Sequence, residues 1–194
     1  MFTASSRGIF YQRSFPELGK SLSLRKFTSA DLGLFHRWHN LPRVAHFWKL
    51  QGSLEEHAAY IQRTLNDPHE EAAIIEADGT PVGYVEFYWI KDDELAKYCE
   101  AQDFDRGFHF LVGERKFLGR QNTQAVVQAI LHHIYQDEPR TRRVLVEPRV
   151  DNDKVLRYAR TEFGWRKLKE FEAPGWRSVL LENRREDFFR AFSH

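Results

Sequence analysis

The sequence predicts a mixed α/β domain in which helices flank a central sheet of about seven strands. Three observations lead to this class. Apolar patterns of strand period and helix period alternate along the chain, two capping boxes mark helix starts, and glycine-containing turns join neighbouring strands. A chain of 194 residues most simply forms one domain. We expect residues 1–20 to form an N-terminal arm and residues 21–194 to form that domain.

The first half of the chain is expected to contain one strand, two helices and a hairpin. Leu22 and Leu24 alternate with polar residues, as in a half-buried strand. Capping boxes at residues 28–31 and 53–56 predict two helices, the first ending near Asn40. The second helix should close at residues 66–68 and bury one face, formed by Leu54, Ala58, Ile61 and Leu65. Strands at 72–77 and 82–89 flank a hairpin signal at 78–81, where Gly79 accepts positive φ.

The second half begins with a polar, acidic segment, residues 91–105, that we interpret as a loop or short helix. An apolar strand then runs to Gly113, and after a turn at 118–122 a helix is expected from Thr123 to Tyr135. The remaining expected elements are a strand at 143–146, a helix at 152–163, two closing strands at 166–171 and 178–182, and a terminal helix at 184–192.

The strand, turn and helix between residues 105 and 135 predict a phosphate site. The first N–H groups of a helix have no hydrogen-bond partner within the helix and attract anions. A glycine turn before the helix lets the backbone come close to such an anion. This arrangement suits ligands that carry a pyrophosphate, of which coenzyme A is one. The residues expected to hold the pyrophosphate are Leu118, Gly119, Arg120, Gln121, Asn122 and Thr123.

Composition excludes several classes of protein. Lys plus Arg at 29 against Asp plus Glu at 28 gives a net charge of +1, so no strong field favours nucleic acid. The single Cys99 excludes an internal disulfide framework, no run approaches the length of a membrane span, and the first residues lack the apolar core of a secretory signal. We expect a cytoplasmic protein. His36 with His39, and His132 with His133, lack a completing ligand, so no metal is expected.

Five motifs in their order and spacing resemble the GNAT superfamily of acyl-CoA-dependent N-acyltransferases. Within it they are most similar to the branch that acylates N-hydroxylysine or related hydroxylamines for hydroxamate siderophores, such as the aerobactin and mycobactin acyltransferases. The motifs are His36-Arg37-Trp38-His39-Asn40, Val44 to Trp48, Gly83 to Trp89, Asp105 to His109, and Glu147-Pro148 with Asn152. The resemblance covers roughly residues 22–190. It implies the GNAT fold and acetyl-CoA or another acyl-CoA as co-substrate.

Acyl transfer needs a proton acceptor for the attacking nitrogen, donors for the oxyanion and a proton for the leaving thiolate. His109, with an unperturbed pKa of about 6.5, fits the first need, although a strand histidine is more often structural. The resemblance implies that a carboxylate pairs with it, and Glu147 fits, either accepting the proton or orienting His109. An exposed strand end is the alternative for Glu147. Tyr158 is a candidate to protonate the thiolate.

The other expected site residues contact the two substrates. For the cofactor these are Phe110, Leu111 and Val112, whose backbone would pair with pantetheine and hold the oxyanion, and Asn152, which could equally cap a helix. For the acceptor, the polar or amphipathic residues within the motifs are Trp38, Asn40, Trp48, Glu86, Tyr88 and Arg106. A carboxylate could bind an α-ammonium group and Arg106 an α-carboxylate, whereas Trp38 and Tyr88 are more often core residues.

Other functions stay open at this level. One is a different GNAT enzyme that acetylates an aminoglycoside, a polyamine or a protein N-terminus. Another is a non-catalytic GNAT-like binding module, because Leu118 and Gln121 stand where the family usually has a basic residue and a glycine. Expected partners are a small hydroxylated diamino acid or diamine and siderophore synthetases, with the chain a monomer or homodimer. The acyl donor and the acceptor are not fixed by the sequence.

Overall fold

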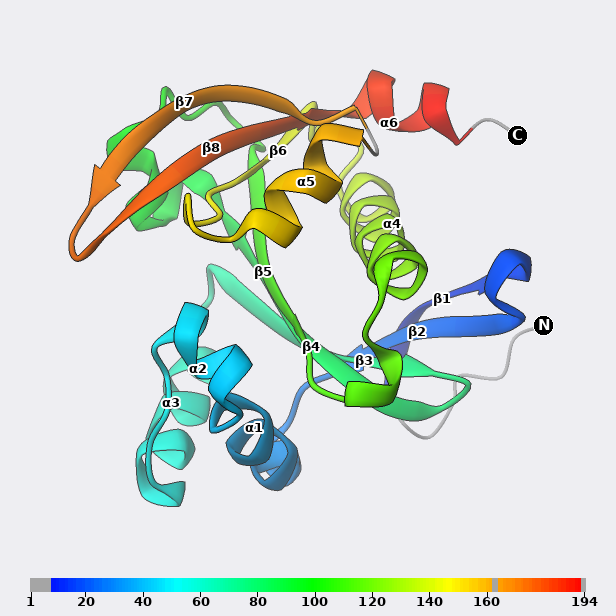
Figure 1. Cartoon of the computed structure of the whole chain (residues 1–194), viewed down its shortest axis with the longest axis vertical. Coiled ribbons are helices and arrows are strands. Elements are labelled where there is room, and N and C mark those ends of the chain that lie inside the picture. Colours follow the sequence, from blue (N-terminus) through cyan, green and yellow to red (C-terminus); the bar gives the residue numbers. More distant parts are fainter. Residues whose placement is uncertain (1–7, 162–163, 193–194) are drawn as a thin grey trace. The chain divides into compact units, whose positions relative to one another are not determined.

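A computed structural model describes residues 8–161 and 164–192, and its elements are drawn in Figure 1. It confirms a mixed α/β fold, with eight strands within the described residues instead of about seven, in the order β1-β2-β3-β4-β5-β6-β8-β7. The strands are β1 Ile9–Phe15, β2 Lys20–Lys26, β3 Glu70–Ala77, β4 Thr80–Trp89, β5 Arg106–Val112, β6 Arg143–Val146, β7 Arg166–Ala173 and β8 Trp176–Arg184. The α-helices are α1 Leu32–His39, α2 Pro42–Trp48, α3 Leu54–Asn66, α4 Arg120–Asp137, α5 Asp153–Thr161 and α6 Arg185–Ala191.

Two elements were missed in the sequence. Strand β1 lies inside the expected arm and pairs antiparallel with β2, from Ile9↔Arg25 to Phe15↔Lys20. Helix α2 was not predicted, because a proline after the end of one helix does not by itself indicate the start of another. Pro42 occupies the first turn of α2, where its missing N–H costs nothing. Three α-helices therefore lie between β2 and β3.

Two helices differ in detail from the prediction. In α3 the buried residues are His57, Ile61 and Thr64, whereas Leu54 and Leu65 are 49% and 43% exposed, so the expected apolar face was wrong at both ends. Helix α4 begins at Arg120, and Thr123 N–H donates to Gly119 C=O at 2.9 Å. Arg120, Gln121 and Asn122 therefore belong to the first helical turn and not to the preceding turn. The helix predicted at 152–163 corresponds to α5, and its expected end at Phe163 lies outside the described residues.

The chain divides into two compact units. The first contains residues up to 86 together with 110–129. Its core packs α1 and α3 against β3 and β4, with the side chains Phe27, Phe35, Trp38, Val44, Ile61, Ala72, Ile74, Tyr84 and Leu111. The predicted capping boxes form at Thr28 with Asp31 and at Ser53 with Glu56. Asp78 and Gly79, both at positive φ, make the predicted hairpin turn.

The second unit contains residues 87–109 and those from 130 onward. Its core near β6 and β8 consists of Tyr88, Ile90, Leu95, Leu145 and Leu180. Strands β6 and β8 pair antiparallel, and β8 pairs antiparallel with β7. None of the helices in residues 8–161 and 164–192 has the length and apolar character that a bilayer-spanning segment needs.

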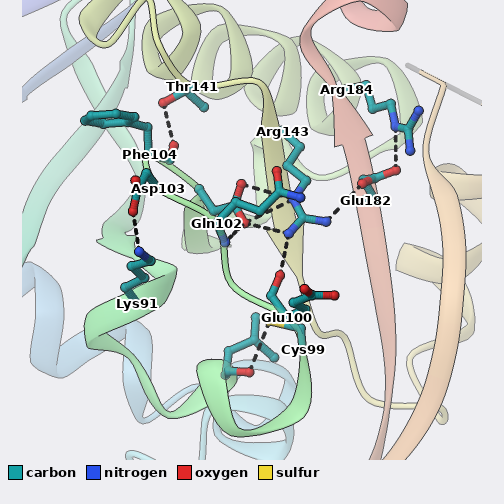
Figure 2. A network of polar contacts seen from close by, with 12 residues as sticks. Lys91, Cys99, Glu100, Gln102, Asp103, Phe104, Thr141, Arg143, Glu182 and Arg184 are labelled. Carbon is teal, nitrogen blue, oxygen red and sulfur yellow. Dashed lines mark hydrogen bonds and ion pairs between the residues drawn. The ribbon is translucent and has the colours of Figure 1, made fainter.

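A polar network within the second unit holds the acidic segment 91–105 in place, as Figure 2 shows. Arg143 of β6 donates from Nη2 to Asp105 at 2.7 Å and to the carbonyl of Glu100 at 2.7 Å. Its Nη1 lies 3.4 Å from Glu182 of β8. The buried Asp105 also accepts a hydrogen bond from the backbone N–H of Gln102 at 2.8 Å. The segment predicted as a loop or short helix contains two 3₁₀ helices and is tied to β6 and β8 by these charges.

Candidate active site

The candidate site begins where β5 and β6 stop pairing. These strands are parallel and pair at Arg106↔Val144 and Gly107↔Leu145. His109 lies two residues beyond the last pair on β5, and Glu147 directly follows β6. Both residues thus lie beyond the last paired positions of the two strands.

His109 and Glu147 are in direct contact. His109 Nε2 lies 2.7 Å from Glu147 Oε1, a distance typical of a charge-assisted hydrogen bond. The His109 side chain is 43% exposed and that of Glu147 is 19% exposed. The imidazole is therefore the member of the pair that solvent, or a substrate, reaches more easily. The imidazole is thus accessible enough for the catalytic role expected of His109, and that role stays a prediction.

The pairing also determines which imidazole nitrogen is basic. An ionised carboxylate can only accept hydrogen bonds, so His109 Nε2 carries the hydrogen that reaches Glu147. In the neutral imidazole the other nitrogen, Nδ1, then holds the lone pair. A proton accepted at Nδ1 gives an imidazolium whose charge Glu147 offsets. Of the two roles considered for Glu147, orientation of His109 fits this geometry.

Two further groups belong to this neighbourhood, and sequence reasoning did not assign them to the dyad. Tyr88 Oη lies 3.2 Å from Glu147 Oε2 and 3.3 Å from His109 Nε2. Asp93, from the segment after β4, has its pKa raised because it is partly buried and is repelled by Glu147, while His109 acts in the opposite direction. The proximity of Tyr88 could have been found only by placing β4 beside β5, which fixes which residues face each other.

Tyr158, the expected acid, lies on α5 and is half-buried. Its role as the acid stays a prediction, and the Tyr88 hydroxyl is a phenol group that contacts His109 and Glu147. Asn152 accepts from Val155 N–H at 3.4 Å through its side chain, and its carbonyl accepts from Leu156 N–H at 3.0 Å. This geometry supports the helix-cap interpretation of Asn152.

The expected phosphate turn is exposed in the first unit. Leu118, Gly119, Arg120 and Gln121 are all exposed, and Gly119 has a φ of 131° that favours glycine. They precede or begin the 18-residue α4, so the first N–H groups of a long helix are presented there. Asn122 and Thr123 follow in the first turn and are half-buried. The backbone arrangement expected for an anion is therefore present.

A further residue that sequence reasoning missed holds the end of β5 in place. Arg43 of α2 donates to the carbonyls of Val112 and Gly113 at 2.7 and 2.5 Å. Burial lowers the pKa of this guanidinium. Phe110 is half-buried and Leu111 and Val112 are buried. The strand backbone that we expect to pair with pantetheine is thus held by a cation on its carbonyl side.

Most of the expected acceptor-binding residues make internal contacts instead. Trp38 is 0% exposed and its Nε1 donates to Glu114 at 2.9 Å. Glu86 is 3% exposed and accepts from the hydroxyls of Tyr60 and Tyr84 at 2.9 and 2.8 Å. These contacts favour packing roles for Trp38 and Glu86.

Apart from Tyr88, three expected acceptor-binding residues remain, and they also make contacts within the protein. Arg106 is 5% exposed, lies 4.2 Å from the centre of the Trp89 ring and is 3.7 Å from Asp137. Asn40 is exposed but both ends of its amide bond to the backbone of Gly52. Trp48 is half-buried against the core of the first unit. The residues that the structure brings together are His109, Glu147 and Tyr88, all within the second unit.

Comparison with known proteins adds to this geometry. Residues 28–173 match the acetyltransferase (GNAT) domain family. The chain is 38% identical over 184 residues to N(6)-hydroxylysine O-acetyltransferase of Escherichia coli, covering 94% of this chain and 58% of the relative. It is 37% identical over 186 residues to N(5)-hydroxyornithine:cis-anhydromevalonyl coenzyme A-N(5)-transacylase of Beauveria bassiana, covering 94% of this chain and 40% of the relative. The chain thus spans about half the length of these relatives.

Solved structures agree on the fold. An uncharacterised protein of Bacillus halodurans superposes with a TM-score of 0.90 at 29% identity, over 96% of this chain and 95% of that one. An aminoglycoside acetyltransferase in complex with coenzyme A superposes with a TM-score of 0.78 at 21% identity, over 88% of this chain and 99% of that one. The second likeness shows the fold alone.

Proposed function

Because the chain belongs to the acetyltransferase (GNAT) domain family, we propose that it transfers an acyl group from coenzyme A to a hydroxylamine nitrogen. The acceptor is the side-chain hydroxylamine of N-hydroxylysine, N-hydroxyornithine or a related diamine, and the product is a hydroxamate for siderophore biosynthesis. The observation that carries the proposal is the 2.7 Å pair of His109 and Glu147 where β5 and β6 separate. The names of the relatives that act on hydroxylysine and hydroxyornithine support the acceptor class.

In this proposal His109 moves the proton. As the nitrogen attacks the thioester carbonyl, a C–N bond forms and His109 Nδ1 accepts the proton that the nitrogen loses. The C–S bond then breaks, and the imidazolium returns the proton to the departing thiolate. A hydroxylamine nitrogen is much less basic than an alkylamine and is largely neutral near pH 7, so a base of ordinary histidine strength suffices. Glu147 holds the imidazole and offsets its transient charge.

The co-substrate is acetyl-CoA or another acyl-CoA, and no metal takes part. Its pyrophosphate is expected at residues 118–123, where the exposed start of α4 presents backbone N–H groups. The backbone of 110–112, braced by Arg43, is expected to bind the pantetheine amides and the oxyanion. The proposal includes a cytoplasmic location, siderophore synthetases as partners and a monomer or homodimer.

A donor and acceptor screen tests the proposal. Acetyl-, succinyl- and longer acyl-CoA are offered to N-hydroxylysine, N-hydroxyornithine, lysine and an aminoglycoside, with thiol release as the readout of transfer. Ferric colour identifies the product, because an N-acylated hydroxylamine binds Fe³⁺ as a hydroxamate and an O-acylated one does not. We expect thiol release and colour with a hydroxylated diamino acid. Thiol release without colour would mean transfer to oxygen, and transfer only to the aminoglycoside would overturn the acceptor class.

Binding of acetyl-CoA, measured by calorimetry, separates an enzyme from a non-catalytic module. We expect heat of binding in the wild type. No heat and no thiol release with any donor would leave the chain as a GNAT-like binding module. The variant His109→Ala is expected to keep the heat of binding and to lose transfer about 100-fold or more, the usual contribution of a general base.

A further inference from the structure

Tyr88 touches both members of the catalytic pair. Its hydroxyl donates to Glu147 Oε2 at 3.2 Å, on the carboxylate oxygen that His109 does not use. The same hydroxyl oxygen lies 3.3 Å from His109 Nε2 and can accept a share of its N–H. The two rings are close as well, with centroids 4.9 Å apart. The Tyr88 hydroxyl, the Glu147 carboxylate and the His109 imidazole thus all contact one another.

The position of the Tyr88 ring depends on Gly107. A Cβ placed on Gly107 would lie 2.3 Å from Tyr88 Cε2, 2.5 Å from Cζ and 2.8 Å from the hydroxyl oxygen. All three distances are shorter than real Cβ contacts, so the ring lies across the bare backbone of β5. Only glycine at this position lets the hydroxyl reach the pair from β4.

The rest of the ring is fixed by apolar packing. Tyr88 is 6% exposed and lies in the cluster with Ile90, Leu95, Leu145 and Leu180. Glu147 also interacts electrostatically with Asp93 and Cys99, and burial raises the pKa of both groups. Glu147 thus has these two groups as electrostatic neighbours and the Tyr88 hydroxyl as a hydrogen-bond donor.

The geometry points to Tyr88 as a positioning residue that acts through Glu147. By holding Oε2, it directs Oε1 at His109 Nε2 and so keeps the imidazole in the form whose lone pair is on Nδ1. Without this donor the carboxylate can rotate about its terminal bond, and both imidazole forms become populated. This role rests on the proposed function. It replaces the substrate contact that the sequence suggested for Tyr88.

Kinetics of Tyr88→Phe, Glu147→Gln and the double variant test the role. Tyr88→Phe keeps the ring and removes the hydroxyl, and we expect kcat to fall about tenfold with KM unchanged, as for loss of a residue that orients another. Glu147→Gln should lower kcat further. If Tyr88 acts through Glu147, the double variant is no slower than Glu147→Gln alone. Independent, multiplying losses would overturn the inference.

The matched control is Tyr98→Phe. Tyr98 packs against the same cluster, and its ring stacks on Phe171 with centroids 4.4 Å apart. It loses the same hydroxyl without touching the pair. We expect its kcat to equal that of the wild type. An equal fall in both tyrosine variants would mean that the effect comes from packing and would overturn the inference.

Nitrogen NMR of His109 gives a readout that needs no activity. In ¹⁵N-histidine-labelled protein near pH 8, the wild type should show a protonated Nε2 and an unprotonated Nδ1. Tyr88→Phe should move both signals toward the averaged values of a mixture, and Tyr98→Phe should not. A fixed tautomer in Tyr88→Phe would overturn the inference even if no acyl acceptor were found. Absence of transfer in the wild type would instead count against the proposed function.

Discussion

Buried histidines should make this protein sensitive to mild acid, and His39 allows the size of the effect to be worked out. The His39 side chain is 0% exposed, and its Nδ1 donates to the carbonyl of Phe35 at 3.0 Å. Its Nε2 has no hydrogen-bond partner within the described residues. Burial lowers the pKa of His39 to about 4. The unfolded chain has an ordinary histidine, with a pKa of about 6.5.

The sign follows from which state binds the proton. Between pH 6.5 and 4 the unfolded chain is protonated at this position and the folded chain is not, so stability rises with pH in this window and is lost as pH falls. A pH of 5 lies about 1.5 units below the pKa of this histidine in the unfolded chain. Protonation of the unfolded chain there lowers the free energy of unfolding by about 2 kcal/mol. For a chain of this size that is a fall in Tm of roughly 4–8 °C. His133, whose pKa burial also lowers to about 4, should contribute similarly.

Urea unfolding of the wild type and of His39→Phe at pH 8 and pH 5 measures the effect. Phenylalanine keeps a ring beside Phe35, whose centroid lies 3.8 Å from that of His39, and removes the titration. We expect the variant to lose about 2 kcal/mol less than the wild type between the two pH values. His46→Phe, at an exposed position on α2, is the control and should behave as the wild type. Equal losses in all three proteins would refute the reasoning.

Three further changes have definite outcomes. Asp93→Asn should raise stability at pH 7, because burial raises the pKa of Asp93 and its charged form is the costly one; the gain, measured by urea unfolding, should shrink as pH falls toward 4. Gly107→Ala should displace the Tyr88 ring, lowering kcat about as far as Tyr88→Phe does and costing a further 1–3 kcal/mol or so in thermal unfolding. Asp105→Asn should cost about 3 kcal/mol in urea unfolding, because it leaves the guanidinium of Arg143 without its main counter-charge; an unchanged midpoint would contradict this.

Elements with local signals could be predicted from the sequence. The capping boxes at Thr28 and Ser53 form as expected, and β6 has the predicted bounds 143–146, because caps and short apolar runs act through neighbouring residues. Helix α2 could not be predicted, since proline can end one helix or begin another and only packing decides which. The start of α4 was placed three residues too late because glycine at 119 and the polar residues after it suit a turn equally well.

The same distinction between local signals and packing applies to the residues of the site. The pairing of Glu147 with His109 was predicted from the family resemblance, and in the structure the two side chains, one on β5 and one directly after the neighbouring β6, lie 2.7 Å apart. Arg106, expected to bind a carboxylate, is instead buried over Trp89 and paired with Asp137. No periodicity encodes that choice, because it depends on which neighbours of opposite charge or aromatic character the fold supplies. The register of the strands and the packing of the helices decide which residues face each other. Neither can be read directly from the sequence.

The unequal exposure of the pair has a consequence for any acceptor. Glu147 is 19% exposed and binds the Nε2 side of an imidazole that is 43% exposed. The carboxylate is therefore the inner member, and a nucleophile that meets the pair meets the imidazole first. A protonated alkylamine would need a stronger base than a histidine, whereas a hydroxylamine arrives without the extra proton. In the proposed reaction the arrangement thus suits the less basic nitrogen, and a preference for hydroxylated over unmodified lysine at pH 7 is the behaviour that would separate the two acceptors.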